Sequence, residues 1–484
     1  MGIILFISVD DLRPEIGCFG RQRLVTPNID KLASRGVRFE HAYCQYPQCM
    51  PSRASVMAGK RPHEWCDRVS QLCGHSEPSL PAHFKSHGYD TVSVGKVYHR
   101  NYDDAESWTR LYDFTFRETS TTGIHGYCSG YQHATNLGLL EDFRSKISSG
   151  QPRPDDLPSM CEIADVADSH YPDNRVAIQA AEVIGEYARN KKDLFLAVGF
   201  YRPHLPWAVP RRYWDLYDRD TVELASNPFL PKDAIGASDM CDFMHYGEPE
   251  IRATYDDLGT YSETNFPVLT ESKQRECVHG YWASVCFIDA QIGIVLDAVD
   301  RAGVHDCTTI VLWGDNGWHL GEHALWSKTT HFEESTRVPV IVADPRAVTD
   351  TSRGGVVSGL VELVDLYPTL CELAAICQPA HLDGQSFVEL LRQNKGRGKP
   401  YVRAINRNGE TVRSKRYRLT RYSHNPSLDP AWHVDRGREW ELFDLVQDPS
   451  EDVNVAGAPE YAPALARMSE ILVAGSSHDR FPVD

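Results

Sequence analysis

The chain has 484 residues, with 50 Lys and Arg against 67 Asp and Glu, so its formal net charge is −17. With 42% hydrophobic and 24% charged residues, it has the composition of a globular protein, and at roughly 100–200 residues per domain it is long enough for two to four domains, or for one large α/β domain with an appendage. The acidic balance excludes a protein whose main partner is nucleic acid, because binding to the phosphate backbone needs a basic surface.

Short β-branched runs alternate with amphipathic stretches over the first 385 residues. Buried strands are expected at 3–9, 91–94, 194–200, 308–313 and 338–342, and helices at 174–190, 281–302 and 361–375. Two long segments, at about 101–172 and 207–267, lack periodicity and are expected to be surface excursions. The alternation predicts an α/β fold with a large, mostly parallel sheet flanked by helices.

The pattern of the sequence changes near residue 385. Short strand-like segments at 401–405, 411–413, 417–422 and 441–445 precede a helical pattern at 461–474. This order predicts a smaller α+β unit with an antiparallel sheet. We therefore expect a large domain at 1–385 and a C-terminal subdomain at 386–484.

The sequence also gives expectations about compartment and redox state. No uninterrupted apolar run approaches the roughly 18 residues that span a bilayer, so no membrane span is expected. No signal-peptide pattern is seen, which predicts a cytoplasmic protein, or a periplasmic or secreted one if a signal was removed. The 13 cysteines show neither zinc-site nor disulfide-framework spacing, and no Asn-x-Ser/Thr acceptor occurs, which favours a bacterial source.

Acidic and amide side chains follow two of the expected strands. Asp10 and Asp11 come after the first strand, and Asp315 and Asn316 follow the strand at 308–313. Carboxyl ends of parallel strands share one edge of a sheet, so these oxygens could meet there and bind a hard cation, Ca²⁺ or Mg²⁺. The alternative is that they only cap helices or fill turns.

A cysteine stands at the beginning of an expected helix. In the segment 49–60, Cys49 precedes the helix start, Pro51 and Ser52 fall in the first turn, and Arg53 projects back towards the thiol. A helix N-terminus and a cation favour an anion at this place. The alternative is an inert buried thiol.

The segment Cys49-Met50-Pro51-Ser52-Arg53 resembles the signature of the type I, formylglycine-dependent sulfatases, although Met57-Ala58 stand where that family commonly has Leu-Thr. The resemblance implies an alkaline-phosphatase-like sandwich fold. It also implies that Cys49 is oxidised to formylglycine by a formylglycine-generating enzyme, so that Cys49 is a precursor and not a thiol nucleophile.

Further similarities to this family extend along nearly the whole chain, in order. Gly95-Lys96-Val97-Tyr98-His99 and Arg202-Pro203-His204-Leu205-Pro206 are similar to its lysine and histidine motifs. The resemblance implies a Ca²⁺ site, or a Mg²⁺ site, formed by Asp10, Asp11, Asp315, Asn316 and the diol derived from Cys49. It implies that the catalytic residues are Cys49, Arg53, Lys96, His99, His204 and Lys328.

The implied reaction has two steps. One diol oxygen attacks sulfur while His204 and Lys328 protonate the leaving sugar oxygen. His99 then removes a proton from the other hydroxyl, and sulfate leaves. The three basic side chains Arg53, Lys96 and Lys328 would face the sulfuryl oxygens, where preorganised positive charge stabilises the transition state.

Within the family, the strings at 9–14, 93–97, 196–199, 320–323 and 360–364 are most similar to the iduronate 2-sulfatases, although Asn316 replaces a histidine of that subgroup. This implies a sulfated saccharide substrate, namely the 2-O-sulfate of a uronic acid. Four residues near Asp315 are expected to line the pocket, or alternatively to pack under the loop: Trp318, His319, His323 and His331.

Two other functions stay open. A phosphonate monoester or phosphodiester hydrolase of the alkaline phosphatase superfamily would share this fold and can share the formylglycine. A degenerate relative that only binds sulfated glycans would need no catalysis. The sequence does not fix the oligomeric state.

Overall fold

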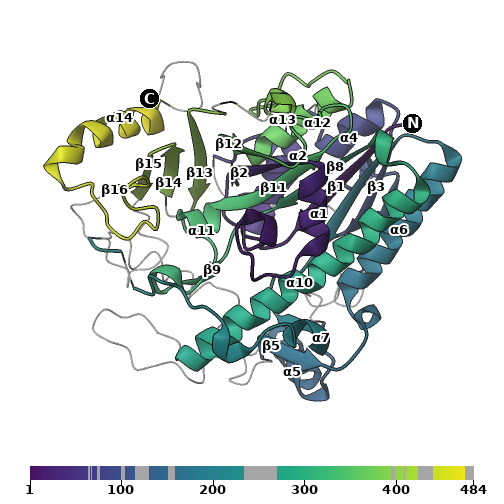
Figure 1. The fold of residues 1–484 in the computed structure, drawn as a ribbon, viewed down its shortest axis with the longest axis horizontal. Coiled ribbons are helices and arrows are strands. Elements are labelled where there is room, and N and C mark those ends of the chain that lie inside the picture. Colours follow the sequence, from purple (N-terminus) through teal and green to yellow (C-terminus); the bar gives the residue numbers. More distant parts are fainter. Residues whose placement is uncertain are drawn as a thin grey trace.

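The computed structural model describes residues 1–63, 66, 68–73, 77–99, 104–114, 130–150, 159–229, 231–233, 270–393, 396, 398–407, 409–422 and 440–474. A large twisted sheet with helices on both faces forms the main body, and a small sheet with one long helix lies beside it (Figure 1). The predicted two-part α/β and α+β arrangement is confirmed.

The large sheet has the strand order β12-β2-β11-β8-β1-β6-β3-β4. Its central pairs β8-β1, β1-β6 and β6-β3 are parallel, whereas β11 runs antiparallel to both β8 and β2. The sheet is therefore mostly parallel, as predicted. The strands are β1 (Ile3–Val9), β2 (Val37–Tyr43), β3 (Asp90–Gly95), β4 (Arg110–Tyr112), β6 (Leu194–Phe200), β8 (Thr308–Gly314), β11 (Arg337–Ala343) and β12 (Gly355–Glu362).

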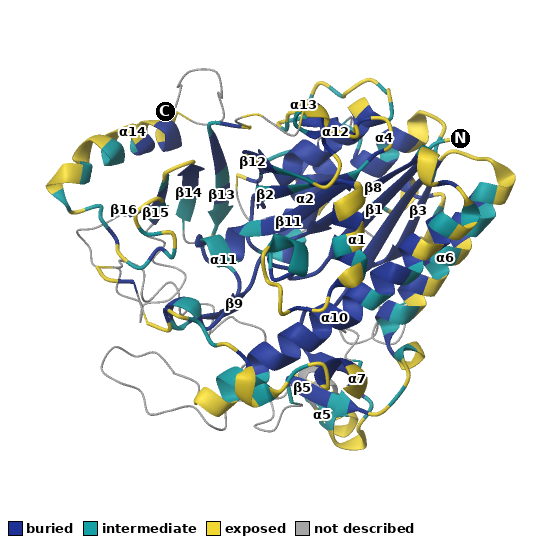
Figure 2. Ribbon diagram, in the orientation of Figure 1, coloured by how far each residue is buried: buried dark blue, intermediate teal, exposed yellow. Residues whose placement is uncertain are grey.

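The central strands are apolar on both faces because helices cover both. Along β1, Ile3, Leu5 and Ile7 pack into one core, while Ile4 and Phe6 pack into the other. Figure 2 shows these strands buried between the two helical layers. One layer contains α1 (Pro27–Arg35), α6 (Pro172–Asn190) and α10 (Glu271–Ala302), and the other contains α2 (Cys49–Ala58), α3 (Val69–Leu72), α4 (Leu80–Ser86), α12 (Leu366–Leu373) and α13 (Val388–Gln393).

The helix α10 is long and apolar enough by length and composition to cross a membrane. A search for uninterrupted apolar runs does not detect it, because polar residues interrupt these runs along the helix. In the structure, 83% of its apolar window is buried, because the helix crosses the main body against α6 and the sheet.

Two expectations differ from the structure. Val361 and Glu362 end β12 by pairing with Ala42 and Tyr43, so the helix predicted from residue 361 begins only at Leu366. The expected surface excursions contain ordered elements: α5 (Ala134–Ser148), α7 (Arg211–Trp214) and the parallel pair of β5 (Cys161–Ala164) and β7 (Trp207–Pro210). Residues 101–103, 115–129, 151–158, 230 and 234–269 of these segments lie outside the described part of the chain.

The small sheet is an antiparallel meander in the order β13-β14-β15-β16. It packs on the last helix through Val412, Leu419, Leu442 and Ile471. The predicted antiparallel sheet is confirmed, and the boundary near residue 385 stays a prediction. The elements are β13 (Tyr401–Asn406), β14 (Gly409–Ser414), β15 (Tyr417–Tyr422), β16 (Trp440–Asp444) and α14 (Ala462–Val473).

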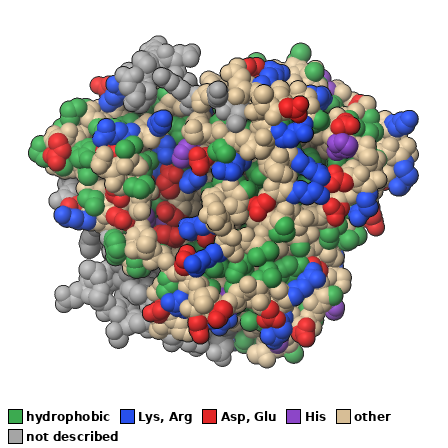
Figure 3. All heavy atoms as spheres, in the orientation of Figure 1, with side chains coloured by type: hydrophobic (Ala, Val, Ile, Leu, Met, Phe, Trp, Pro, Cys, Tyr) green, Lys and Arg blue, Asp and Glu red, His purple; other side chains and the backbone are tan. Residues whose placement is uncertain are grey.

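Charged side chains are interspersed over the face seen in Figure 3, with acidic and basic groups side by side. The described surface on this side is therefore mixed in sign. Attraction of an anion has to come from a local cluster of cations and not from this face as a whole.

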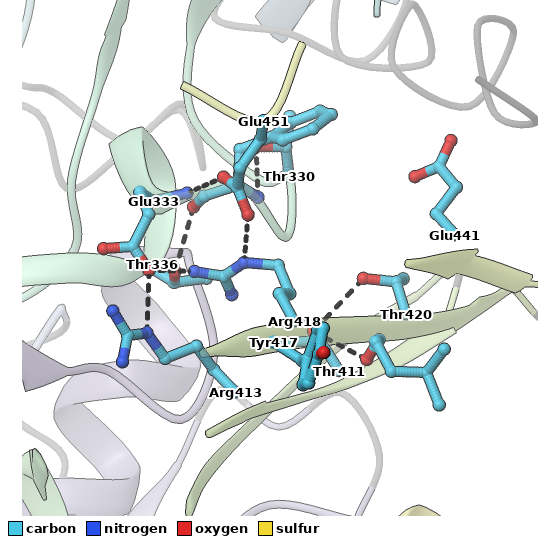
Figure 4. Close-up of polar contacts among 12 residues, drawn as sticks. Thr330, Glu333, Thr336, Thr411, Arg413, Tyr417, Arg418, Thr420, Glu441 and Glu451 are labelled. Carbon is cyan, nitrogen blue, oxygen red and sulfur yellow. Dashed lines mark hydrogen bonds and ion pairs between the residues drawn. The ribbon is translucent and has the colours of Figure 1, made fainter. Parts of the chain in front are cut away.

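A buried charge network joins the small sheet to the main body (Figure 4). Arg418 on β15 forms ion pairs with Glu451 and with Glu333 of the short helix α11 (Glu333–Thr336). Arg413 on β14 also reaches Glu333, at 3.2 Å, and the Glu333 amide donates to Glu451 at 2.8 Å. These contacts tie α11 to the small domain.

Candidate active site

The carboxyl ends of the central strands bring the predicted residues to one edge of the sheet. Asp10 and Asp11 follow β1, Lys96 follows β3, and His204 lies in the loop after β6. Ligands of open α/β sheets bind at this edge. The remaining residues arrive from α2, from the end of β8 and from the hairpin β9 (His319–Leu320) and β10 (Trp326–Ser327); all are buried, and they are Cys49, Arg53, Asp315, Asn316 and Lys328.

Three carboxylates meet at the centre of this cluster. Oxygens of Asp10, Asp11 and Asp315 all lie within 4.8 Å of one another. Asn316 Nδ2 donates to Asp11 Oδ1 at 2.7 Å. Among the described residues, the buried atoms Asp10 Oδ1, Asp11 Oδ2 and Asn316 Oδ1 have no hydrogen-bond partner. Buried oxygens of this kind need a partner, and a set of oxygens alone fits a hard cation such as Ca²⁺ or Mg²⁺.

Three basic side chains face the carboxylates. Arg53 Nε donates to Asp315 Oδ2 at 2.7 Å, Lys328 Nζ donates to Asp11 Oδ1 at 2.7 Å, and Lys96 Nζ donates to Asp10 Oδ2. Burial alone would raise the pKa of Asp10, but Lys96 and the other nearby cations hold it well below its ordinary value. Burial raises the pKa of Asp315 to about 7 against the opposing effect of Arg53. Three basic side chains thus face three carboxyl groups, so the net charge of the cluster without a metal ion is close to zero.

Cys49 is the first residue of α2 and points at a histidine. Its Sγ lies 3.3 Å from His99 Nδ1. Burial raises the pKa of the Cys49 thiol to about 12, and the nearby Lys96 and Lys328 only partly oppose this effect. The unmodified side chain is thus a neutral thiol, which is a poor nucleophile.

Close backbone packing fixes Lys96. A Cβ added at Gly199 would lie 1.9 Å from the Lys96 carbonyl oxygen, and one at Gly95, where φ is +78°, would lie 2.2 Å from the Gly199 carbonyl oxygen. The ends of β3 and β6 can approach this closely only because both residues are glycines. Arg53 Nη1 also donates to the Lys96 carbonyl oxygen, and so connects α2 to this strand end.

Sequence reasoning missed the residues that hold the site from outside. The Tyr281 hydroxyl of α10 donates to the Asp11 carbonyl oxygen at 2.8 Å and accepts from the Arg13 amide at 3.0 Å. Asp173 at the start of α6 accepts from the Tyr201 amide at 2.6 Å, three residues before His204. A tyrosine on a buried helix face and an acidic residue in a first helical turn carry no sequence signal of such a role.

The four residues expected to line the pocket are all buried. Trp318 lies beside the cluster, with Lys328 Nζ 5.5 Å from its ring centroid. His319 and His323 lie next to each other, with ring centroids 6.1 Å apart, and the His331 ring lies 6.3 Å from that of Tyr422 in the small sheet. Burial lowers the pKa of both His319 and His331 to about 3. Contact of these four with substrate stays a prediction.

A cavity of about 690 Å³ lies beside this region. Its lining includes Arg13, Arg21, Glu322 and Glu334, and none of the catalytic or metal-ligand candidates lines it. The cavity is therefore separate from the cluster at the sheet edge.

Comparison with known proteins identifies the family. The sulfatase family model matches residues 3–376. The chain belongs to the sulfatase family. The model of the C-terminal part of N-sulphoglucosamine sulphohydrolase matches residues 321–477 of this sulfatase. Sulfatases are sulfuric ester hydrolases, so the predicted enzyme class is confirmed.

Individual relatives extend this result. The sulfatase is 31% identical to iduronate 2-sulfatase of Mus musculus over 420 residues, which cover 81% of this chain and 72% of that protein. It is 27% identical to the delta 4,5-hexuronate-2-O-sulfatase of Bacteroides thetaiotaomicron over 492 residues, with coverages of 97% and 87%. Its fold is similar to that of the phosphonate monoester hydrolase of Agrobacterium radiobacter, with a TM-score of 0.72, 21% identity and coverages of 98% and 95%. The alkaline-phosphatase-like architecture is thereby confirmed.

Proposed function

We propose that this sulfatase removes the 2-O-sulfate of a uronic acid in a carbohydrate, using formylglycine made from Cys49 and a Ca²⁺ ion at the sheet edge. The observation that carries the proposal is the convergence of Cys49, the three basic side chains and the oxygen cluster at one buried point. The names of the relatives above, an iduronate 2-sulfatase and a hexuronate 2-O-sulfatase, support a uronate substrate.

The residues present fit both cofactors. Asp10, Asp11, Asp315 and Asn316 would hold Ca²⁺, or Mg²⁺, because they offer unpartnered oxygens in a buried place. The bound cation would supply positive charge next to the sulfuryl group, and the converted Cys49 would supply a hydrated aldehyde as the nucleophile. A formylglycine-generating enzyme would be the partner during maturation.

The side chains of the protein would bind the sulfate ester and move protons. Arg53, Lys96 and Lys328 place three positive charges around the cluster, where charge on the sulfuryl oxygens needs stabilisation. His99, in contact with the Cys49 side chain, would hold a proton at that position. His204, whose Nε2 lies 3.7 Å from Asp11 Oδ2, would share with Lys328 the donation of a proton to the leaving oxygen.

The direct test is release of inorganic sulfate from 2-O-, 4-O- and 6-O-sulfated disaccharides by protein matured with a formylglycine-generating enzyme, with Cys49→Ala as the control. Mass spectrometry of the peptide that contains Cys49 measures the conversion. Release from 2-O-sulfated uronates alone, and none by the control, is expected. Release from other positions alone would overturn the uronate assignment but not the mechanism.

The second candidate is a phosphonate monoester or phosphodiester hydrolase. The similarity of fold to the Agrobacterium radiobacter enzyme favours it. Relative kcat/KM values on sulfate and phosphonate esters separate the two, and faster turnover of the phosphonate would replace the sulfate-ester proposal. The bacterial source stays a prediction, and so does the compartment, which is cytoplasmic, or periplasmic or secreted if a signal was removed, and which cell fractionation can check.

A further inference from the structure

Two histidines and a glutamate form a second cluster away from the sheet edge. Nδ1 or Nε2 of His319 and His323 and a carboxylate oxygen of Glu334 all lie within 4.8 Å of one another. They come from β9, from the turn that follows it and from α11. Both imidazoles are fully buried, and the Oε2 atom of Glu334 is buried too.

Hydrogen bonds fix the tautomers of both histidines. His323 Nε2 lies 2.8 Å from the Ser450 carbonyl oxygen, to which it can only donate. His319 Nε2 lies 2.8 Å from Thr330 Oγ1, and the Thr330 hydroxyl donates to Ser335 Oγ at 2.9 Å, so Oγ1 accepts from His319. Each Nδ1 therefore carries a lone pair.

These lone pairs have no partner within the part of the chain that the structure describes. His319 Nδ1, His323 Nδ1 and Glu334 Oε2 are all buried and without a hydrogen bond there. The two imidazole nitrogens cannot satisfy each other, and a protonated Glu334 carboxyl has one proton and could donate to only one of them, so buried acceptors of this cluster would still lack a partner. A bound cation would satisfy all three.

We propose that His319, His323 and Glu334 bind a Zn²⁺-type transition-metal cation. Imidazole nitrogens with one carboxylate suit Zn²⁺ and its neighbours, whereas Ca²⁺ prefers oxygens alone. The hydrogen bonds at Nε2 are of the kind that orients metal-binding histidines. A zinc-to-nitrogen bond is about 2.0–2.1 Å long, so the three ligand atoms must lie closer to one another than the 4.8 Å within which they are found here. Rotation of the side chains can bring them together.

The cluster has a route to solvent. Glu334 and Ser450 both line the cavity of about 690 Å³ described above. A cation can enter by this route, and a water molecule from the cavity can complete a fourth position.

The cation would fix the hairpin that carries Lys328. His319 pairs with Ser327 in the β9-β10 hairpin, and His323 is bonded to Ser450 of the small domain. Ser327 and Thr329 flank Lys328 with φ angles of 79° and 80°, so this segment is strained and needs support from its surroundings. This effect on Lys328 rests on the proposed function, but binding of the cation does not.

The test is a Zn²⁺ titration of metal-free protein, against a chromophoric chelator, with Ca²⁺ present to occupy the oxygen cluster. A Cys377→Ser background removes an exposed thiol that would bind Zn²⁺. The variants are His319→Gln and Glu334→Gln. The matched control is His279→Gln, since His279 is also buried and its Nε2 also lies 2.8 Å from a backbone carbonyl oxygen, that of Trp214.

We expect one tight Zn²⁺ site in the parent and in the control, and an affinity lower by at least on the order of 100-fold in the two variants. Equal affinity in all proteins, or no tight site in the parent, would overturn the proposal. If the variants do not fold, anomalous scattering at the zinc edge from crystals of the parent soaked in ZnCl₂ decides: a peak bonded to both Nδ1 atoms is expected, and its absence overturns the site. Failure of the proposed function is seen separately, as no sulfate release by a protein that still binds Zn²⁺.

Discussion

Replacement of Arg418 by Met tests how the small sheet is held on the main body. Arg418 is 1% exposed and bridges Glu333 and Glu451. After the substitution Glu333 keeps Arg413 at 3.2 Å, whereas Glu451 keeps only the Glu333 amide at 2.8 Å. Glu451 is therefore the group that loses its charge partner.

The size of the effect follows from this geometry. Removal of one member of a buried ion pair lowers the free energy of unfolding by about 3–5 kcal/mol. Burial raises the pKa of Glu451 to about 7 even beside Arg418, so the parent already carries much of the cost of neutralising this carboxyl at pH 7, and the loss falls below the middle of this range. We expect a loss of about 2–3 kcal/mol at pH 7.

The loss should depend on pH with a definite sign. Burial raises the pKa of Glu451 to about 7, against the opposing effect of Arg418. When the pKa of a carboxyl is higher in the folded than in the unfolded protein, protonation of that carboxyl favours the folded state. This contribution to the free energy of unfolding is fully present below the unfolded pKa and is lost as the pH rises through the folded pKa. The loss caused by Arg418→Met should shrink to about 1.5–2 kcal/mol at pH 5.5, because Glu451 is then mostly protonated in both proteins and the variant loses a hydrogen bond rather than an ion pair.

Hydrogen exchange of the β15 amides measures the effect as a local opening free energy, which avoids the assumption that both domains unfold together. Arg421→Met is the matched control, because Arg421 on the same strand forms a partly exposed ion pair with Glu410 and should change the opening little. A loss below about 1 kcal/mol, a loss that does not vary with pH, or an equal loss in the control would refute the reasoning.

Three further outcomes are expected. Cys49→Ala should release no sulfate above the level of the buffer in an ion-chromatography assay, and measurable turnover would contradict a role for formylglycine. Lys328→Met should lower kcat/KM on the best sulfated disaccharide by on the order of 10²–10³-fold, because it removes a preorganised cation from the site; an unchanged kcat/KM would argue against this role. Tyr281→Phe removes the hydroxyl that donates to the Asp11 carbonyl oxygen, and should weaken Ca²⁺ binding in calorimetry by about 10–100-fold; equal affinity would show that Tyr281 does not position the ligands.

The sequence predicted the interior of the fold better than its edges. Residues 3–9 are apolar except for Ser8, residues 194–200 are a continuous apolar run, and both form central strands buried on two faces. β2 was not predicted because its burial is mixed and Glu40 and His41 interrupt its apolar pattern. The helix predicted from residue 361 begins later because Val361 pairs with Ala42, more than 300 residues away in the chain, and no local pattern reports such pairing.

The residues of the candidate site were also predictable only in part. Cys49, Lys96 and His204 were predictable from short motifs, and the structure brings them to one edge of the sheet. Tyr281 and Asp173 were not, because their roles arise only when α10 and α6 pack against the loops after β1 and β6. Motifs report the side chains that the chemistry needs, whereas the groups that hold them depend on tertiary packing.

The charge balance of the cluster leads to a last prediction, on the coupling between cation and anion. Lys96 and Lys328 are bonded to Asp10 and Asp11, whose other oxygens have no hydrogen-bond partner in the described structure. A divalent cation at these oxygens would weaken the hold of both carboxylates on the two lysines, which then become available to a sulfate ion. Ca²⁺ should therefore raise the affinity for sulfate, and sulfate should raise the affinity for Ca²⁺ by the same factor, about 5–150-fold. Calorimetry of unconverted protein measures both factors, with sulfate titrated in EDTA and in saturating Ca²⁺, and Ca²⁺ titrated with and without saturating sulfate. Lys328→Met should reduce the factor, and a factor of one in the parent would mean that the cation does not release the lysines.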